Sequence, residues 1–270
     1  MITASDGFKL YTKEWIPPQY KGVICLIHGY GEHVNRYNHM ADYFNKNGFA
    51  VVGMDTRGYG QSEGIRGHVA NFEVFMTDIE SLINEVKSKY ENSPVFLYGH
   101  SMGGNLVLNY AIRRKPTNLA GVIASAPLIQ TAFQPGKILI FLAKTMRSIY
   151  PTFAQSTKLI QEHLSKDPSV IAAYRADPLV FDSLSAAAGA SILEANAFLD
   201  AYEGALSVPV LIMHGDEDKL TSQPASEAFE KRLKSDATYK KWAGMYHEIH
   251  NEPEKNRVFD YTLGWLDSKI

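Results

Sequence analysis

The sequence predicts an α/β fold in which a mostly parallel central sheet is flanked by helices. Short continuous apolar runs, typical of strands buried on both faces, alternate with segments of helical periodicity. That alternation argues for parallel strands joined by right-handed crossovers. It stops after Pro127 and resumes near residue 205, which indicates a large insertion. The chain has 270 residues, 45% hydrophobic and 21% charged, an ordinary composition that supports one large core.

The elements before the break follow one another at regular intervals. Phe8–Trp15 alternates apolar and polar residues and is predicted to be a half-exposed antiparallel strand at a sheet edge. Buried strands are predicted at Gly22–Ile27, Phe49–Met54, Val95–Tyr98 and Leu119–Ala126. Helices are predicted at Tyr37–Phe44, at Phe72–Tyr90 and from Leu106 onward.

Residues 128–204 form the predicted insertion. Helical patterns dominate it, at Ile138–Ile149, Thr157–Leu164, Ser169–Tyr174 and Leu184–Tyr202. The alternation then returns, with strands at Val208–Met213 and Thr238–Ala243 and helices at Pro224–Leu233 and Glu254–Leu266. We therefore divide the chain into a first core part (1–127), a helical cap (128–204) and a second core part (205–270). Because ligand sites in such sheets lie beyond the carboxyl ends of the strands, we expect this cap to be a lid over the site.

The segment Ile138–Ile149 is notably apolar. One interpretation is a helix packed on the main domain. The other is a hydrophobic mouth that contacts an acyl chain or the surface of a membrane or micelle.

Charge and cysteine content exclude several function classes. The net charge of -2, without a long run of one sign, argues against nucleic acid as a partner. The single cysteine, Cys25, cannot form an internal disulfide and is predicted to be a buried strand residue rather than a nucleophile. The N-terminus lacks a signal pattern, and no stretch approaches the roughly 20 apolar residues of a membrane span. We therefore expect a cytoplasmic location, with peripheral membrane association left open.

The segment Pro94–Asn105, PVFLYGHSMGGN, carries the clearest chemical signal. An apolar run leads into a Gly-x-Ser-x-Gly pentapeptide centred on Ser101, and a helical pattern follows. This pentapeptide between a strand and a helix is the pattern of a nucleophile elbow. The helix N-terminus behind the serine supplies free N–H groups that favour developing negative charge. Ser101 is therefore the predicted nucleophile.

A serine nucleophile needs a base, and the base needs a carboxylate to orient it. The strand at Val208–Met213 is followed by Asp216 and Asp218, and the strand at Thr238–Ala243 is followed by His247 and His250. Asp218 has loop enough to reach back to the base, whereas Asp216 directly follows a glycine turn and is expected to fix that turn. We favour His247 as the base and expect His250 to line the pocket or start the final helix. The His-Glu-Ile-His run is one residue short of the zinc pattern H-E-x-x-H, so no metal site is predicted.

An oxyanion hole needs two backbone N–H groups. One is expected from Met102, which follows the nucleophile, and the other from Tyr30 in the HGYG loop. The bulky Tyr30 side chain is expected to narrow the site. His28 and His100 are interpreted as structural residues of their turns.

Five segments together resemble the monoacylglycerol lipase/lysophospholipase branch of the serine α/β-hydrolases: HGYGEHVNRY, DTRGYGQSEG, GHSMGG, GDEDKL and GMYHEIHNEPE. The resemblance spans nearly the whole chain and implies the α/β-hydrolase fold with an inserted cap. Family members place the catalytic acid at the third residue after the glycine, which matches Asp218. They place the base at the histidine of a G-x-Y-H segment, which matches His247.

The resemblance also implies a glycerol-headgroup site at Glu32, Arg36 and His250. Tyr174, just before the Ala176–Val180 segment, is expected to point into the pocket. The family commonly has a smaller residue at the position of Tyr30, so the width of the acyl pocket is expected to differ. A buried glycerol hydroxyl needs such polar partners. Alternatively, Glu32 and Arg36, four residues apart, simply pair with each other on the surface.

These observations imply a serine ester hydrolase that cleaves monoacylglycerols to fatty acid and glycerol through an acyl-enzyme on Ser101. A lysophospholipase or general carboxylesterase with the same triad is the alternative. A non-catalytic hydrolase-fold binding protein is a third hypothesis. The expected partner is a small-molecule lipid ester, and no cofactor or metal is expected.

Overall fold

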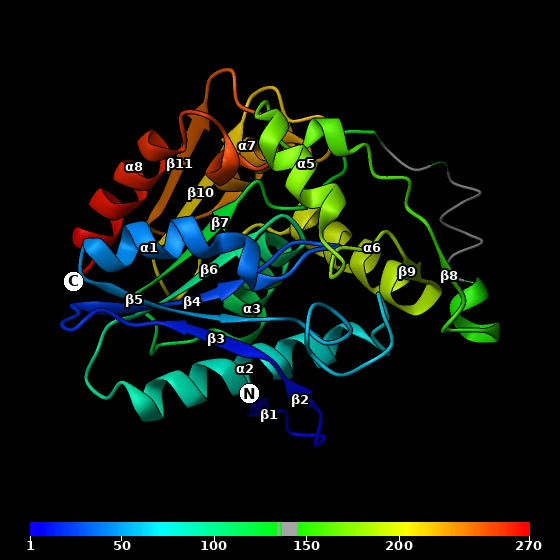
Figure 1. The fold of residues 1–270 in the computed structure, drawn as a ribbon, viewed down its shortest axis with the longest axis horizontal. Coiled ribbons are helices and arrows are strands. Elements are labelled where there is room, and N and C mark those ends of the chain that lie inside the picture. Colours follow the sequence, from blue (N-terminus) through cyan, green and yellow to red (C-terminus); the bar gives the residue numbers. More distant parts are fainter. Residues whose placement is uncertain (134–135, 137–144) are drawn as a thin grey trace.

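The fold is organised around one seven-stranded sheet, shown in Figure 1. A computed structural model describes residues 1–133, 136 and 145–270. The strand order is β11-β10-β7-β6-β4-β5-β3. The parallel strands are β4 (Gly22–Ile27), β5 (Phe49–Met54), β6 (Val95–His100), β7 (Gly121–Ser125), β10 (Val210–Gly215) and β11 (Ala237–Trp242). The predicted parallel sheet is confirmed.

The edge strand is shorter than predicted. β3 (Thr12–Trp15) pairs antiparallel with β5 at the sheet edge, as expected. The chain before it leaves the sheet, because β2 (Lys9–Leu10) pairs instead with β1 (Ile2–Thr3). The two are separated at Tyr11, whose N–H donates to Ser62 Oγ (2.8 Å) and whose C=O accepts from the Asp55 N–H (2.9 Å).

Helices cover both faces of the sheet (Figure 1). On one face, apolar strand residues pack with α1 (Asn38–Lys46) and α8 (Lys255–Asp267). On the other, they pack with α2 (Phe72–Lys89), α3 (Met102–Arg114) and α7 (Gln223–Arg232). Cys25 in β4 is fully buried, and burial raises the pKa of its thiol to about 12. The prediction of a buried strand cysteine is confirmed.

The inserted segment is less helical than predicted. It contains a two-stranded antiparallel ladder, β8 (Ala154–Gln155) with β9 (Leu184–Ser185), and the helices α5 (Pro168–Ala176) and α6 (Ala186–Ala201). The helices predicted near α5 and α6 are confirmed. The helix predicted at Thr157–Leu164 is wrong, since only the short 3-10 turn η2 (Gln161–His163) forms there. The apolar segment predicted from Ile138 lies outside the described residues up to 144, and 145–149 is helical.

The failed helix has an identifiable cause. The backbone N–H groups of Thr157 and Lys158 each donate to the carboxylate of Asp182 at 3.0 Å. Lys158 also has a φ of 54°, outside the right-handed helical region. A contact made 24 to 25 residues along the chain therefore outweighs the local helical pattern.

No helix within residues 1–133, 136 and 145–270 combines the length and the apolar character needed to cross a bilayer.

Candidate active site

Ser101 occupies a strained turn between β6 and α3. Its φ of 54° and ψ of -114° form a backbone conformation that non-glycine residues rarely adopt. Its N–H donates to Ser125 O (2.9 Å), and its C=O accepts from the Leu128 N–H (3.0 Å). A Cβ on Gly103 would lie 2.3 Å from Ile27 O, so only glycine lets α3 start this close to β4. This is the geometry of a nucleophile elbow.

Asp218 and His247 meet through a hydrogen bond, with His247 Nδ1 donating to Asp218 Oδ2 over 2.7 Å. They lie in the loops after β10 and β11, which are neighbours in the sheet. The other carboxylate oxygen accepts from the N–H groups of Leu220 (2.7 Å) and Thr221 (3.0 Å). Because a carboxylate only accepts, Nδ1 must carry the hydrogen and Nε2 is the basic nitrogen.

Each member of this pair shifts the pKa of the other. Burial alone would raise the pKa of Asp218, but the rings of His247 and His214 hold it well below its usual range. Burial alone would lower the pKa of His247, but the charge and hydrogen bond of Asp218 outweigh it and raise that pKa above 6.5. The arrangement therefore pairs an ionised acid with a strengthened base.

His100 lies between His247 and the turn that carries Ser101. It directly precedes Ser101, and its ring centroid lies 4.8 Å from that of His247. Burial lowers the pKa of His100 to about 3, so its ring is neutral. This agrees with its interpretation as a packing residue.

Two further residues take the structural roles that we expected. The Gly244 N–H donates to Asp216 Oδ1 (2.7 Å), so Asp216 fixes the turn. His28 is fully buried, where its Nδ1 donates to Gly29 O (2.7 Å) and its Nε2 accepts from the Thr56 N–H (2.9 Å).

Tyr30 and Met102 flank the nucleophile. A Cβ on Gly29, next to Tyr30, would lie 3.3 Å from Ser101 Cβ, so this loop runs against the elbow. Within the described part of the chain, the backbone N–H groups of Tyr30 and Met102 donate to no other protein group. Both can therefore donate to an oxyanion.

The side chain of Tyr30 forms part of an apolar wall. Its ring contacts those of Tyr59 and Phe181, with centroids 6.3 and 6.4 Å away. Met102 and Ile192 belong to the same cluster. The wall joins the core to the inserted segment beside the backbone N–H groups of Tyr30 and Met102. That Tyr30 narrows the site stays a prediction.

Glu32 and Arg36 are ion-paired, but not on the surface. Glu32 is 2% exposed, and its carboxylate also accepts from the Gly29 N–H and the Tyr37 hydroxyl, each at 2.7 Å. Arg36 additionally donates through both terminal nitrogens to Glu248, at 2.8 Å each. The surface-pair interpretation is therefore right about the pairing and wrong about its location. The buried cluster holds two carboxylates on one guanidinium.

His250 and Tyr174 lie on either side of this cluster. His250 is fully buried and stacks on Tyr37, with ring centroids 4.8 Å apart. Neither of its ring nitrogens has a partner among the described residues, and burial lowers its pKa well below the usual range. Tyr174, on α5, places its ring 4.7 Å from the Arg36 guanidinium. The structure thus brings all four predicted headgroup residues into one region.

The inserted segment is fastened to the loop that carries His247. Leu164 O accepts from the Glu248 N–H (2.7 Å), and Ser165 Oγ donates to Asn251 O (3.0 Å). Glu252 reinforces the loop by accepting from the Tyr246 N–H (2.9 Å). The position of the loop that carries His247 therefore depends directly on residues 164–165.

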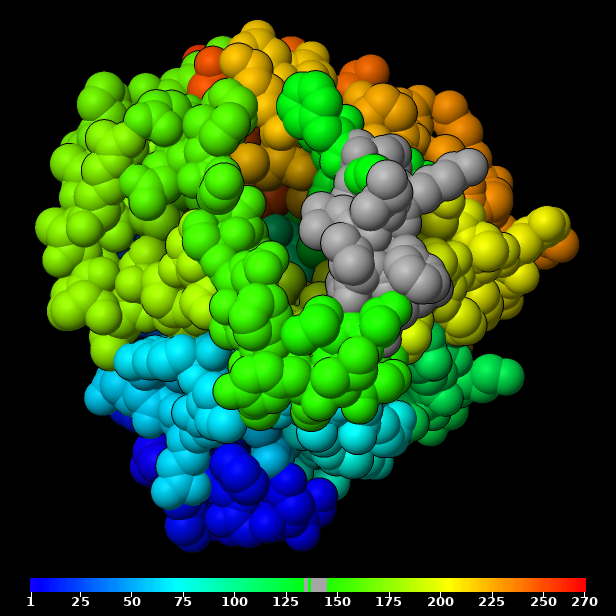
Figure 2. Space-filling view, turned by 90° about the vertical axis from the view of Figure 1, so that its right-hand side faces the viewer, coloured from blue at the N-terminus to red at the C-terminus, as the bar shows by residue number. Residues whose placement is uncertain are grey.

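The face that carries the inserted segment is hollowed. Figure 2 shows this hollow bordered by green segments of the insertion and orange segments of the C-terminal part.

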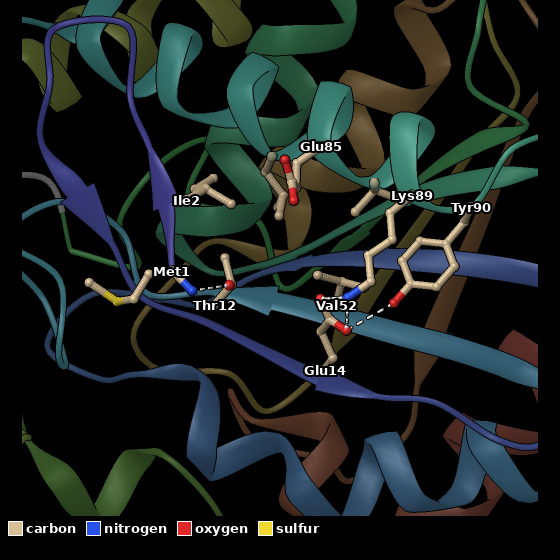
Figure 3. A pocket seen from close by; sticks show the side chains of 10 residues that line it. Met1, Ile2, Thr12, Glu14, Val52, Glu85, Lys89 and Tyr90 are labelled. Atoms are coloured by element: carbon tan, nitrogen blue, oxygen red, sulfur yellow. Dashed lines mark hydrogen bonds and ion pairs between the residues drawn. The ribbon is translucent and has the colours of Figure 1, made fainter.

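A separate pocket of about 250 Å³ lies between α2 and the N-terminal strands (Figure 3). Glu14 in that pocket accepts from Lys89 Nζ (2.7 Å) and the Tyr90 hydroxyl (3.0 Å). Neither the predicted nucleophile, acid nor base lines it.

Among the residues that the structure describes, no group of three or more His, Cys, Asp or Glu side chains is arranged to hold a metal ion.

The Hydrolase_4 family model, described as serine aminopeptidase, S33, matches residues 18–254. The chain belongs to this family. The resemblance to serine α/β-hydrolases that the motifs indicated is confirmed, together with the fold class.

Several relatives align over most of the chain. A monoacylglycerol lipase from Mycolicibacterium smegmatis is 32% identical over 98% of this chain and 95% of its own. Phospholipase YtpA from Bacillus subtilis is 28% identical over 95% of this chain and 99% of its own. The crystal structure of Paleococcus ferrophilus monoacylglycerol lipase has a TM-score of 0.86 at 32% identity, covering 97% of this chain and 100% of that one. The chain spans only 29% of an uncharacterised abhydrolase domain-containing protein from Dictyostelium discoideum that is 32% identical.

Sequence reasoning missed two residues of this site. His214 is the last residue but one of β10 and lies against Asp218, and Glu248 follows His247 and accepts from Arg36. A signal existed for the first, because a histidine at the end of an apolar buried strand must find hydrogen-bond partners. Glu248 offered no such signal, since its partner lies 212 residues away in sequence.

Proposed function

We propose that this chain is a serine ester hydrolase that cleaves monoacylglycerols to a fatty acid and glycerol. The observation that carries the mechanism is the 2.7 Å bond from His247 to Asp218, next to a serine held in the strained elbow. The similarity to monoacylglycerol lipases over nearly the whole chain supports the substrate class.

The reaction proceeds in two halves on Ser101. His247 Nε2 takes the hydroxyl proton as Ser101 Oγ attacks the ester carbonyl, and Asp218 stabilises the resulting imidazolium. The N–H groups of Tyr30 and Met102 hold the oxyanion. The imidazolium then gives its proton to the departing glycerol oxygen. Water then gives a proton to His247 as it attacks the acyl-enzyme. The bond to Ser101 Oγ breaks, the fatty acid leaves, and the imidazolium returns its proton to Ser101 Oγ.

The glycerol end of the substrate is assigned to Glu32, Arg36, His250 and Tyr174. His250 supports this assignment because its ring nitrogens lack protein partners within the described residues, and an uncompensated buried polar group is costly. Glu32 and Arg36 are held in place by their ion pairs, so they present a preorganised polar wall rather than mobile side chains.

Residues 128–204 act as the cap in this proposal. Their exposed apolar side chains include Ile149, Tyr150, Phe153 and Ile160. Such side chains favour transient contact with a membrane or micelle surface, from which a single-chain ester would be taken up.

A fluorophosphonate probe tests the nucleophile. The folded wild type is expected to be labelled, and Ser101→Ala is expected to lose both labelling and ester turnover. No labelling of the folded wild type would exclude the mechanism.

A substrate panel tests the substrate class. Monoacylglycerol turnover is expected to exceed that of lysophosphatidylcholine and of short p-nitrophenyl esters. The similarity to phospholipase YtpA makes lysophospholipid hydrolysis the second candidate, which faster turnover of lysophosphatidylcholine would favour. Turnover of short esters alone would identify a general carboxylesterase instead.

A further inference from the structure

A second histidine lies on the catalytic acid. His214, next to the last residue of β10, is fully buried, and its Nε2 lies 2.9 Å from Asp218 Oδ2. This is the same oxygen that accepts the His247 Nδ1–H at 2.7 Å. One carboxylate oxygen therefore faces two imidazole rings.

The hydrogen positions around His214 follow from its partners. Because the carboxylate only accepts, Nε2 of His214 must carry the hydrogen. Its other ring nitrogen, Nδ1, is paired with the buried hydroxyl of Ser226 on α7, at 2.9 Å. The result is a continuous hydrogen-bonded chain from Ser226 through His214 to Asp218, to which His214 and His247 both donate.

His214 is not needed merely to hold the loop that carries Asp218. Asp218 already accepts from two backbone N–H groups on Oδ1 and from the Thr221 hydroxyl on Oδ2 (2.8 Å). The ring of His214 joins the Thr221 hydroxyl on Oδ2, the oxygen that orients the base, and adds a ring N–H there. Since two N–H donors share that oxygen, His214 both fixes its direction and limits how far it strengthens the base.

We propose that His214, held by Ser226, is a positioning residue that directs Asp218 Oδ2 toward His247 and sets the basicity of that histidine. This inference rests on the proposed function. The other titratable groups that face His247 are His100 from β6, Glu248 from its own loop and Glu32 from the loop after β4. His214 differs from them because it acts through the acid.

The first test compares His214→Leu, which removes the donor, with His214→Gln, which keeps an N–H near the Nε2 position. H214L is expected to lower kcat for a monoacylglycerol by about 10- to 100-fold, the scale of a lost charge-assisted hydrogen bond. KM is expected to stay within about twofold, because the residue does not touch substrate. The acid limb of kcat/KM is expected to move to higher pH, since Asp218 then acts on His247 alone. H214Q is expected to restore the limb and most of kcat.

The second test uses a matched pair of buried serines. Ser226→Ala removes the group that orients His214 and is expected to lower kcat by about two- to fivefold. Ser191→Ala removes a buried hydroxyl that has no partner within the described residues, and is expected to behave as wild type. Thermal melts verify that each variant is folded.

Two results would overturn the inference. The first is a folded H214L variant with wild-type kcat and an unshifted acid limb. If H214L does not fold, wild-type kcat in Ser226→Ala is decisive in the same way. A wild-type protein that is folded yet hydrolyses no ester would instead overturn the proposed function.

Discussion

The buried ion pair between Arg36 and Glu248 allows a quantitative test of the site's architecture. Both terminal nitrogens of Arg36 donate to Glu248 at 2.8 Å, and the two side chains are 9% and 2% exposed. Glu248→Ala removes one partner and leaves the guanidinium buried with only Glu32 to balance it. Breaking a buried pair in this way destabilises the fold more than the pair stabilised it, because the remaining charge stays desolvated.

The expected magnitude follows from the size of the chain. Removing one partner of a buried pair costs about 3–5 kcal/mol. An unfolding entropy of about 2.1 cal/mol/K per residue gives about 0.57 kcal/mol/K for 270 residues. The Tm of E248A is therefore expected to fall by about 5–9 °C at neutral pH.

The loss should depend on pH with a definite sign. Burial opposes ionisation of Glu248, but Arg36 holds its pKa well below the usual range. A carboxyl whose pKa is depressed on folding contributes stability above its unfolded value of about 4.3. That contribution is lost as the pH falls from there toward the folded value. The Tm difference between wild type and E248A should therefore shrink below about pH 4.

Melts followed by circular dichroism at pH 7 and pH 3 measure both effects. Glu254→Ala is the control, because its pair with Arg257 is 59% and 65% exposed and surface pairs contribute under about 1 kcal/mol. The Tm of E254A should move by less than about 2 °C. Equal losses in E248A and E254A at pH 7 would refute the reasoning.

Three further predictions concern catalysis and the elbow. Asp218→Asn should lower kcat by about 10⁴-fold, because an amide donor facing Nδ1 selects the wrong tautomer of His247. Circular dichroism should show that the fold is intact. A loss of kcat below tenfold would contradict this role of Asp218. Since His247 must be neutral to accept a proton and its pKa is raised, the acid limb of kcat/KM should be centred above pH 6.5, and a pH profile centred below it would count against the pair. Gly103→Ala should lower the free energy of unfolding by about 3 kcal/mol in denaturant titrations. Gly264→Ala is the control, because a Cβ there meets nothing within 4 Å, and it should raise the free energy of unfolding by about 0.5–1 kcal/mol. Similar effects of the two substitutions would argue against the close approach of α3 to β4 at Gly103.

The sheet could be predicted because its signal is local. Every residue of β4, β5 and β6 is buried, so each strand appears as one continuous apolar run. Ser101 and Asp218 each follow such a run, whereas His247 follows the partly exposed β11. Parallel strands place their ends at one edge of the sheet. The hydrogen bond between acid and base could thus be anticipated from chain order and turn residues.

The features that could not be predicted depend on contacts between segments that are distant in the sequence. The helix predicted at Thr157–Leu164 fails because the carboxylate of Asp182 captures backbone N–H groups there. The burial of Glu32 and Arg36 depends on Glu248, from the opposite end of the chain. Ser226, which orients His214, lies on a helix whose rotation the sequence does not specify. No periodicity in the sequence encodes these pairings.

Residues 164–165 contact the loop that carries His247, and these contacts limit which segments of this enzyme can be exchanged with those of a relative. A chimaera that exchanges 128–204 for a relative's insertion must reproduce the Leu164 carbonyl and the Ser165 hydroxyl in place. Otherwise His247 loses its support although the nucleophile, acid and base are all present. Exchanges that leave Leu164 and Ser165 unchanged offer a route to new ester selectivity without disturbing proton transfer.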